Sequence, residues 1–175
     1  GIDIYFFVGN HDLWMKDYLE EEIGIPVFFE KQYYEISGKN FLLAHGDGLG
    51  PGDKGYKRMK KLFTNPIAQW FFKWLHPDIA MKIAVYFSTK NKMISGVEDM
   101  KFLGEDKEFL ILYSKEKLKS EKIDYFVYGH RHLPMILDLK IDENAAKYVN
   151  LGDWISYFTY GVFDGEEFKI EEYKQ

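Results

Sequence analysis

The chain has 175 residues, the length of one ordinary domain with room for a substantial core. Hydrophobic residues make up 46% of it and aromatic residues 18%, which excludes a disordered or fibrous protein. The chain contains no cysteine, which excludes disulfides and thiolate chemistry, and its formal net charge of −5 argues against a broad nucleic-acid-binding surface. We therefore expect no nucleic-acid partner.

The first 50 residues predict short strands joined by tight turns. We expect strands over residues 4–8, 27–30, 33–37 and 40–44, and a short acidic helix over residues 13–23. The last two strands flank Gly38-Lys39, which predicts a two-residue hairpin turn with glycine first. The chain starts inside its first strand without an initiator methionine, so we expect further strands and a helix upstream.

From about residue 48 to residue 92 the composition changes, and a glycine-rich loop followed by three helices is predicted as an insertion. Asn65-Pro66 and His76-Pro77 place proline where the first turn of a helix tolerates it, and His76 is expected to cap a helix. No stretch predicts a membrane span, because even the most apolar one carries charged residues.

The second half alternates a helix with several strands. A charged helix is expected over residues 105–121, with Phe109, Leu112, Tyr113 and Leu118 on its inner side. Strands are expected over residues 123–128, 135–141, 147–151, 157–163 and 168–173, with Asp164-Gly165 as a hairpin turn. Together these elements predict one α/β domain over residues 1–175.

Four of the five histidines lie in three short clusters that each follow an apolar strand. The clusters are Asn10-His11-Asp12, His45-Gly46-Asp47 and His130-Arg131-His132. Strand ends are where α/β folds gather catalytic groups, and imidazole with amide or carboxylate oxygen suits Mn, Fe, Zn or Co. Each cluster alone could be a turn or a core residue, but the three together favour a metal site.

The ordered motifs Gly9-Asn10-His11-Asp12, His45-Gly46 and Gly129-His130-Arg131-His132 resemble the calcineurin-like metallophosphoesterase superfamily. This resemblance implies a layered β-sandwich flanked by helices and a site for two divalent ions, most often Mn²⁺, that neutralise a phosphoryl group and activate water. It further implies that Asn10, His45 and His130 hold one ion and that His132 contributes to the other. His11, oriented by Asp12, would stabilise or protonate the leaving oxygen.

The sequence departs from the superfamily pattern near its start. An Asp-x-His motif and a Gly-Asp-x-x-Asp motif precede the others in the family, and neither is present here. The second of these supplies the aspartate that bridges the two ions, and Asp47 is a weak substitute for it. We therefore expect an N-terminally truncated domain whose site is poorly metallated and inactive in this chain alone.

The insertion narrows the expected substrate. Its middle helix is apolar nearly all round, with Trp70, Phe71 and Trp74, and a basic run over residues 54–61 precedes it. This pattern favours an apolar ligand or an anionic membrane surface. A helix buried between its neighbours, and a solvated basic face, are the alternatives.

The insertion also resembles the lid of the UDP-2,3-diacylglucosamine hydrolase family of Gram-negative bacteria, through His45-Gly46-Asp47, Asp53, Tyr56 and Asn65-Pro66. The resemblance implies hydrolysis of UDP-2,3-diacylglucosamine to UMP and 2,3-diacylglucosamine 1-phosphate in lipid A biosynthesis. It implies a peripheral enzyme on the cytoplasmic face of the inner membrane. The implied substrate-binding residues are Asp53, Tyr56, Ser88, Lys90 and Asn91 for the polar part, and Trp70, Phe71 and Trp74 for the acyl chains.

One departure and two alternatives accompany this interpretation. His11 stands where the better-known branch of the hydrolase family has arginine, although the superfamily has histidine there. A metallophosphoesterase acting on another phosphodiester, nucleotide or phosphoprotein is the first alternative. A metal-free, non-catalytic scaffold is the second.

Overall fold

The computed structural model describes residues 1–15, 17–52, 54–95 and 101–174, and it describes only the backbone of residues 87, 88 and 90–95. Within them the strands are β1 (Phe6–Phe7), β2 (Val27–Phe28), β3 (Gln32–Ile36), β4 (Lys39–Ala44), β5 (Tyr125–Tyr128), β6 (Met135–Ile141), β7 (Asn144–Asn150), β8 (Thr159–Phe163) and β9 (Phe168–Glu172). The helices are α1 (Lys54–Phe63), α2 (Pro66–Lys73), α3 (Pro77–Ser95) and α4 (Phe109–Leu118), with one π-helical turn at Leu19–Ile23.

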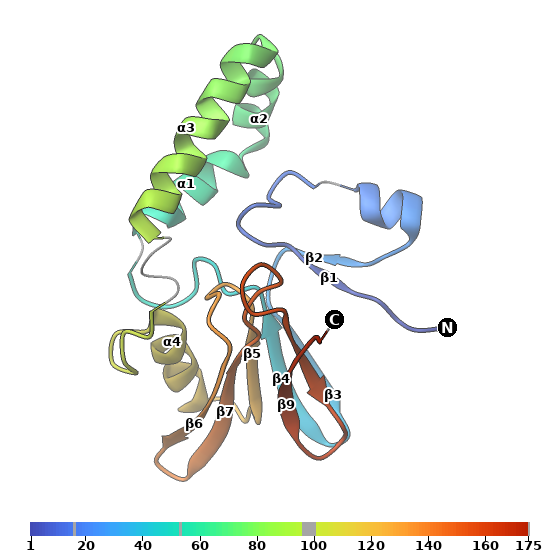
Figure 1. The fold of residues 1–175 in the computed structure, drawn as a ribbon, viewed down its shortest axis with the longest axis vertical. Helices are drawn as coiled ribbons and strands as arrows, with labels where there is room; N and C mark the ends of the chain where they lie inside the picture. The colour runs from blue at the N-terminus through green and yellow to red at the C-terminus, as the bar shows by residue number, and fades with distance from the viewer. Residues whose placement is uncertain (16, 53, 96–100, 175) are drawn as a thin grey trace.

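A five-stranded mixed sheet with the order β3-β4-β5-β7-β6 forms the centre of the molecule (Figure 1). Strands β4, β5 and β7 run parallel, so their carboxyl ends meet at one edge. Every residue of β5 is buried, as expected for a central strand covered on both faces. This layered α/β arrangement confirms the predicted fold class.

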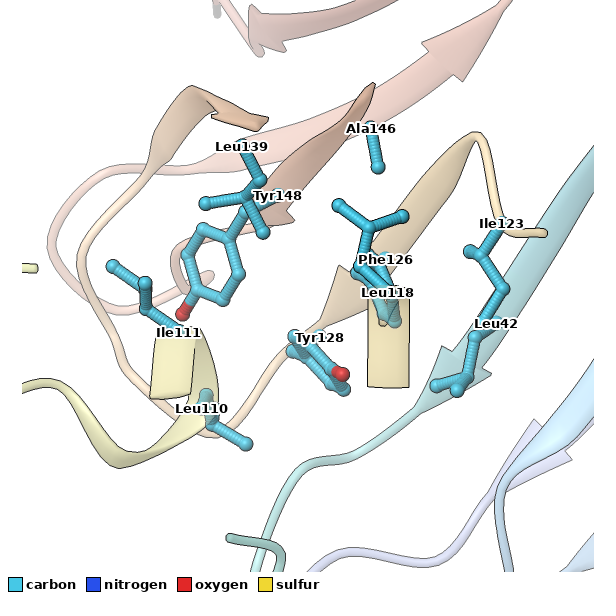
Figure 2. Packing of buried hydrophobic residues seen from close by; sticks show 10 residues of the cluster. All are labelled: Leu42, Leu110, Ile111, Leu118, Ile123, Phe126, Tyr128, Leu139, Ala146 and Tyr148. Carbon is cyan, nitrogen blue, oxygen red and sulfur yellow. The ribbon is translucent and has the colours of Figure 1, made fainter. Parts of the chain in front are cut away.

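Helix α4 covers one face of this sheet. Leu110, Ile111 and Leu118 of the helix pack against Phe126 and Tyr148, all of them almost fully buried (Figure 2). The one polar side chain that α4 buries, Ser114, donates its hydroxyl to the carbonyl of Leu110 and lies 3.0 Å from the hydroxyl of Tyr128. The buried polar atoms under the helix are thus paired, as a stable core requires.

The hairpin β8–β9 covers the opposite face. Phe163 and Phe168 pack there against Phe41 and Tyr125, whose rings stack 4.8 Å apart. Strands β1 and β2 form a separate parallel pair beside the sheet, extended by the hydrogen bond from the amide of Val8 to the carbonyl of Phe28.

Helices α1 to α3 fall within the predicted insertion and project together away from the sheet (Figure 1); we call them the helical arm. Asn65 caps α2 by accepting hydrogen bonds from the amides of Ile67 and Ala68, with Pro66 in the first turn. His76 caps α3 as predicted, since its Nδ1 accepts from the amide of Asp78 at 3.3 Å. Over the part of the chain that is described, no helix combines the length and apolar character needed to cross a membrane.

Several sequence predictions about local structure were wrong. The hairpin turn lies at Ser37-Gly38 instead of Gly38-Lys39, because Ile36 pairs directly with Lys39. Ser37 and Gly38 both have positive φ, 51° and 74°, the conformation of a type I′ turn. The acidic helix shrinks to one π-helical turn, ended by Gly24 with a φ of 73°.

The third correction concerns α4. The helix starts at Phe109. Of the residues predicted on its inner side, Leu118 is buried, Phe109 and Tyr113 are partly buried and pack against the core, and Leu112 is partly buried. The helix also buries Leu110, Ile111 and Ser114, which were not predicted to lie inside. Glu108, extended and buried against Arg131, fixes where the helix begins and so which face meets the sheet.

Candidate active site

The ends of β4 and β5 bring two of the histidine clusters together. His45 follows β4 and His130 follows β5 by two residues, and the carbonyl of His45 accepts hydrogen bonds from the amides of both Gly129 and His130. Nδ1 of His130 lies 3.4 Å from Nε2 of His45. Asn10, from the loop after β1, places its Oδ1 3.0 Å from the same Nε2. The structure therefore joins three predicted metal ligands in one group.

The chemistry and spacing of these three donors fit one divalent ion. Neighbouring ligands of an ion bound at about 2.1 Å lie about 3.0 to 3.4 Å apart, which matches the separations from His45. Burial lowers the pKa of His45 to about 4, and the nearby His130 adds to the effect. Its imidazole is therefore neutral near pH 7, with a lone pair available to a metal.

Two glycines permit this close approach. A Cβ at Gly9 would stand 3.0 Å from Cε1 of His45, closer than side chains normally come. Gly46 has a φ of 114°, and a Cβ there would meet Leu110 at 3.0 Å and His130 at 3.2 Å. Larger residues at either position would push the histidines apart.

His132 lies at the same edge but has a different partner. Its Nδ1 is 3.3 Å from Oδ2 of Asp153, which follows β7. Burial raises the pKa of Asp153, but hydrogen bonds from the amides of residues 155–157 and the nearby His132 outweigh it and hold the pKa below its usual range. This pairing leaves Nε2 of His132 as the atom that could face a ligand. In the sequence, Gly152-Asp153-Trp154 follows an apolar strand and is compatible with a structural turn or with a border of the pocket.

Only part of a two-ion site is present in this arrangement. Among the described residues, no three histidine or acidic side chains come together as a metal-binding group. His132 as a ligand of a second ion stays a prediction. Asp47, the alternative bridging ligand, accepts hydrogen bonds from Tyr56 and Lys60.

His11 and Asp12 occupy the loop beside Asn10. The side chain of His11 is exposed, and within the described part of the chain no hydrogen bond or ion pair connects it to Asp12. Orientation of His11 by Asp12 therefore stays a prediction. The exposed position suits a group that meets a substrate from solvent.

Asp47 ties the strand end to the helical arm. Its Oδ2 accepts hydrogen bonds from the hydroxyl of Tyr56 at 2.6 Å and from Nζ of Lys60 at 2.7 Å. Burial raises the pKa of Asp47, but these two partners outweigh it and hold the pKa below its usual value. Tyr56, predicted to bind substrate, is thus also a structural link between α1 and the site. The sequence held no signal for the role of Lys60.

The aromatic residues predicted to hold acyl chains lie on α2. Trp70, Phe71 and Trp74 are 53%, 62% and 75% exposed, so the alternative of a helix buried between its neighbours is wrong. On the other side of α2, Trp14 from the Asn10 loop packs edge-on against Phe72, with ring centres 4.8 Å apart. The remaining predicted substrate residues lie outside the described part of the chain: Asp53 and the side chains of Ser88, Lys90 and Asn91.

A cavity of about 430 Å³ opens between the β1–β2 pair and α1. The residues that line it include Phe7, Phe28, His45, Asp47, Lys57 and Lys61. The helical arm thus supplies lysines to a space that His45 also lines.

Comparison with known proteins places the chain in a family. No family model matches it. It is 37% identical to a UDP-2,3-diacylglucosamine hydrolase of Porphyromonas gingivalis over 98% of this chain and 69% of the relative. The chain belongs to the UDP-2,3-diacylglucosamine hydrolase family. Enzymes of that name from Yersinia pestis and Yersinia pseudotuberculosis are 26% identical over 88% of this chain and 62% of their own length.

The match with the Porphyromonas hydrolase spans almost the whole chain. It therefore includes both the sheet edge that carries His45 and His130 and the helical arm beside it. The resemblance inferred from the histidine motifs and the lid order is confirmed for this hydrolase family.

Proposed function

We propose that this protein hydrolyses UDP-2,3-diacylglucosamine, the substrate in the names of its relatives. The products would be UMP and 2,3-diacylglucosamine 1-phosphate. The observation that carries the proposal is the convergence of Asn10, His45 and His130 within 3.0 to 3.4 Å contacts, next to an arm with exposed aromatic residues. A polar phosphoryl-handling centre beside an apolar surface suits a substrate with a pyrophosphate at one end and acyl chains at the other.

The chain's own residues divide the chemical work. Asn10, His45 and His130 would hold a divalent ion, for which we propose Mn²⁺, and His132 would contribute to a second. Such ions neutralise phosphoryl charge and lower the pKa of water. His11 faces solvent beside this centre, where it can donate a proton to the departing phosphate oxygen or stabilise the negative charge on it.

The helical arm provides the apolar half of the proposed site. Trp70 contacts both Phe71 and Trp74, with ring centres 5.0 and 5.6 Å apart, so the three rings form one continuous surface. Contiguous exposed apolar surface usually marks a binding face. We propose that it covers the acyl chains and rests on the inner-membrane surface, with the exposed Lys54 and Arg58 of α1 facing anionic headgroups.

A direct assay tests the reaction. The purified protein with Mn²⁺ is incubated with UDP-2,3-diacylglucosamine, and release of UMP and the lipid monophosphate is followed by mass spectrometry. We expect both products in equal amounts from protein loaded with two Mn²⁺ per molecule, and loss of both products with EDTA or in His45→Ala. Absence of products from the metal-loaded, folded protein would rule out the proposed activity for this chain.

A second experiment tests the role of the arm. Replacing Trp70, Phe71 and Trp74 together by serine removes the apolar surface without touching the histidines. We expect lipid turnover to disappear while a small chromogenic phosphodiester is still hydrolysed. A matched triple leucine variant keeps the apolar character and should retain most lipid turnover. Full lipid turnover in the serine variant would instead favour a metallophosphoesterase with another substrate.

A further inference from the structure

Arg131 separates the two histidines of the His130-Arg131-His132 motif, and its side chain is deeply buried. Only 5% of the side chain of Arg131 and 3% of that of Glu108 are exposed, and Nη2 of Arg131 lies 2.9 Å from Oε1 of Glu108. The two neighbouring histidines are only partly buried. Arg131 therefore anchors the loop that carries His130 and His132 to the buried interior.

The pair also joins three segments of the chain. Nη2 of Arg131 donates to the carbonyl of Lys101 at 2.8 Å, and Oε1 of Glu108 accepts from the amide of Leu103 at 3.1 Å. Residues 101–108 connect the helical arm to α4, and Glu108 immediately precedes that helix. One buried ion pair thus fixes the histidine loop, the segment returning from the arm and the start of α4.

The surroundings of the pair are buried. Burial raises the pKa of Tyr148, which lies within electrostatic reach of both charges, to about 12. Phe109, the residue after Glu108, packs its ring 6.0 Å from that of His130. A displacement of Glu108 would therefore be passed directly to His130.

We propose that Arg131 is a positioning residue, which sets the spacing of His130 and His132 through its buried pair with Glu108. The inference rests on the proposed function only in taking these histidines as metal ligands. Groups that orient metal ligands from behind commonly change metal affinity by about 10- to 100-fold when they are replaced. An ion pair needed only for folding would change stability and leave metal affinity unchanged.

The test compares Mn²⁺ affinity with thermal stability. Removing Arg131 alone would strand the buried charge of Glu108, so the main variant is the double replacement Arg131→Met with Glu108→Gln. Glutamine keeps the acceptor for the amide of Leu103. Arg131→Lys, which keeps the charge but loses the planar fork, is the milder second variant and remains usable if the double variant does not fold. Ser114→Ala is the matched control, because it removes a buried hydrogen bond of α4 away from the loop.

Isothermal titration with Mn²⁺ and thermal melting of the metal-free protein give the two readouts. We expect the double variant to bind Mn²⁺ about tenfold or more weakly, Arg131→Lys to lie between it and the wild type, and Ser114→Ala to lose stability with unchanged affinity. Wild-type affinity in both Arg131 variants, or equal loss of affinity in Ser114→Ala, would overturn the inference. If the wild type binds Mn²⁺ and the variants lose it while the lipid is never cleaved, only the proposed function fails.

Discussion

His45 and His11 belong to neighbouring motifs at one sheet edge, yet their surroundings suit them to opposite tasks. His45 is enclosed by Asn10 and His130, and burial lowers its pKa to about 4, so it offers a lone pair at any physiological pH. The side chain of His11 is exposed to solvent in the loop beside Asn10, where it can meet the departing oxygen of a substrate. The first environment suits a metal ligand and the second suits a proton donor.

This contrast predicts different outcomes for two alanine substitutions. His11→Ala should lower turnover of the lipid substrate by about 10²- to 10⁴-fold, the usual contribution of a general acid, and leave Mn²⁺ affinity unchanged. His45→Ala should lose Mn²⁺ binding together with activity. Steady-state kinetics and Mn²⁺ titration on the same preparations measure both quantities. Wild-type turnover in His11→Ala would remove His11 from the mechanism.

At the scale of elements, the pattern of apolar residues located each strand of the central sheet. The run from Met135 to Ile141 was predicted as a strand, and β6 has these bounds. Its hairpin partner was predicted too short, because the turn at Asp142-Glu143 contains no glycine and relies on Asp142 at a φ of 52°. An aspartate in a left-handed conformation leaves little trace in a sequence.

Contacts at the candidate site also differ in whether the sequence predicts them. The meeting of His45 and His130 could be predicted, because each follows a buried strand and such strands pair in parallel. The contact of His132 with Asp153 and the ion pair of Lys60 with Asp47 could not be predicted. Both join side chains from separate elements, whose packing decides the partner and which no local periodicity encodes.

The prediction at the scale of elements concerns the link between α1 and the end of β4. Lys60→Met removes the charged partner of Asp47, whose side chain is only 4% exposed, and leaves Tyr56 as its remaining donor of the two. We expect the free energy of unfolding to fall by about 1 to 3 kcal/mol. The KM for the lipid should also rise, since α1 is no longer fixed to the strand end, while kcat for a small phosphodiester should change little.

Chemical denaturation and kinetics with both substrates measure these effects. Lys82→Met on α3 is the control, because Lys82 is an exposed lysine of the same arm and lies outside both the Asp47 pair and the cavity lining. Equal stability and equal lipid KM in the two variants would mean that the Asp47–Lys60 pair does not hold the arm in place.

For the whole molecule, the parallel strands and the arm act as two separate supports. The sheet fixes the histidine loops from a fully buried core, whereas α1 and α2 bury none of their own residues and project beyond it (Figure 1). Their contact runs through few groups, chiefly Asp47 with α1 and Trp14 with Phe63 and Phe72. Such a division would suit the proposed function, with the apolar surface on the arm and the phosphoryl centre on the sheet.

The partners of the polar side chains at this sheet edge set an expectation for how much metal the chain holds. Asn10, His45 and His130 form one group with the spacing of a single coordination shell, whereas His132 turns its Nδ1 to Asp153, and Asp47 is held by Tyr56 and Lys60. We therefore expect the 175-residue chain, loaded with Mn²⁺ and desalted, to retain about one ion per molecule by elemental analysis. His130→Ala should reduce this value to near zero, and His132→Ala should leave it nearly unchanged. Two ions per molecule, both lost with His132→Ala, would mean that the described residues rearrange to build a second site.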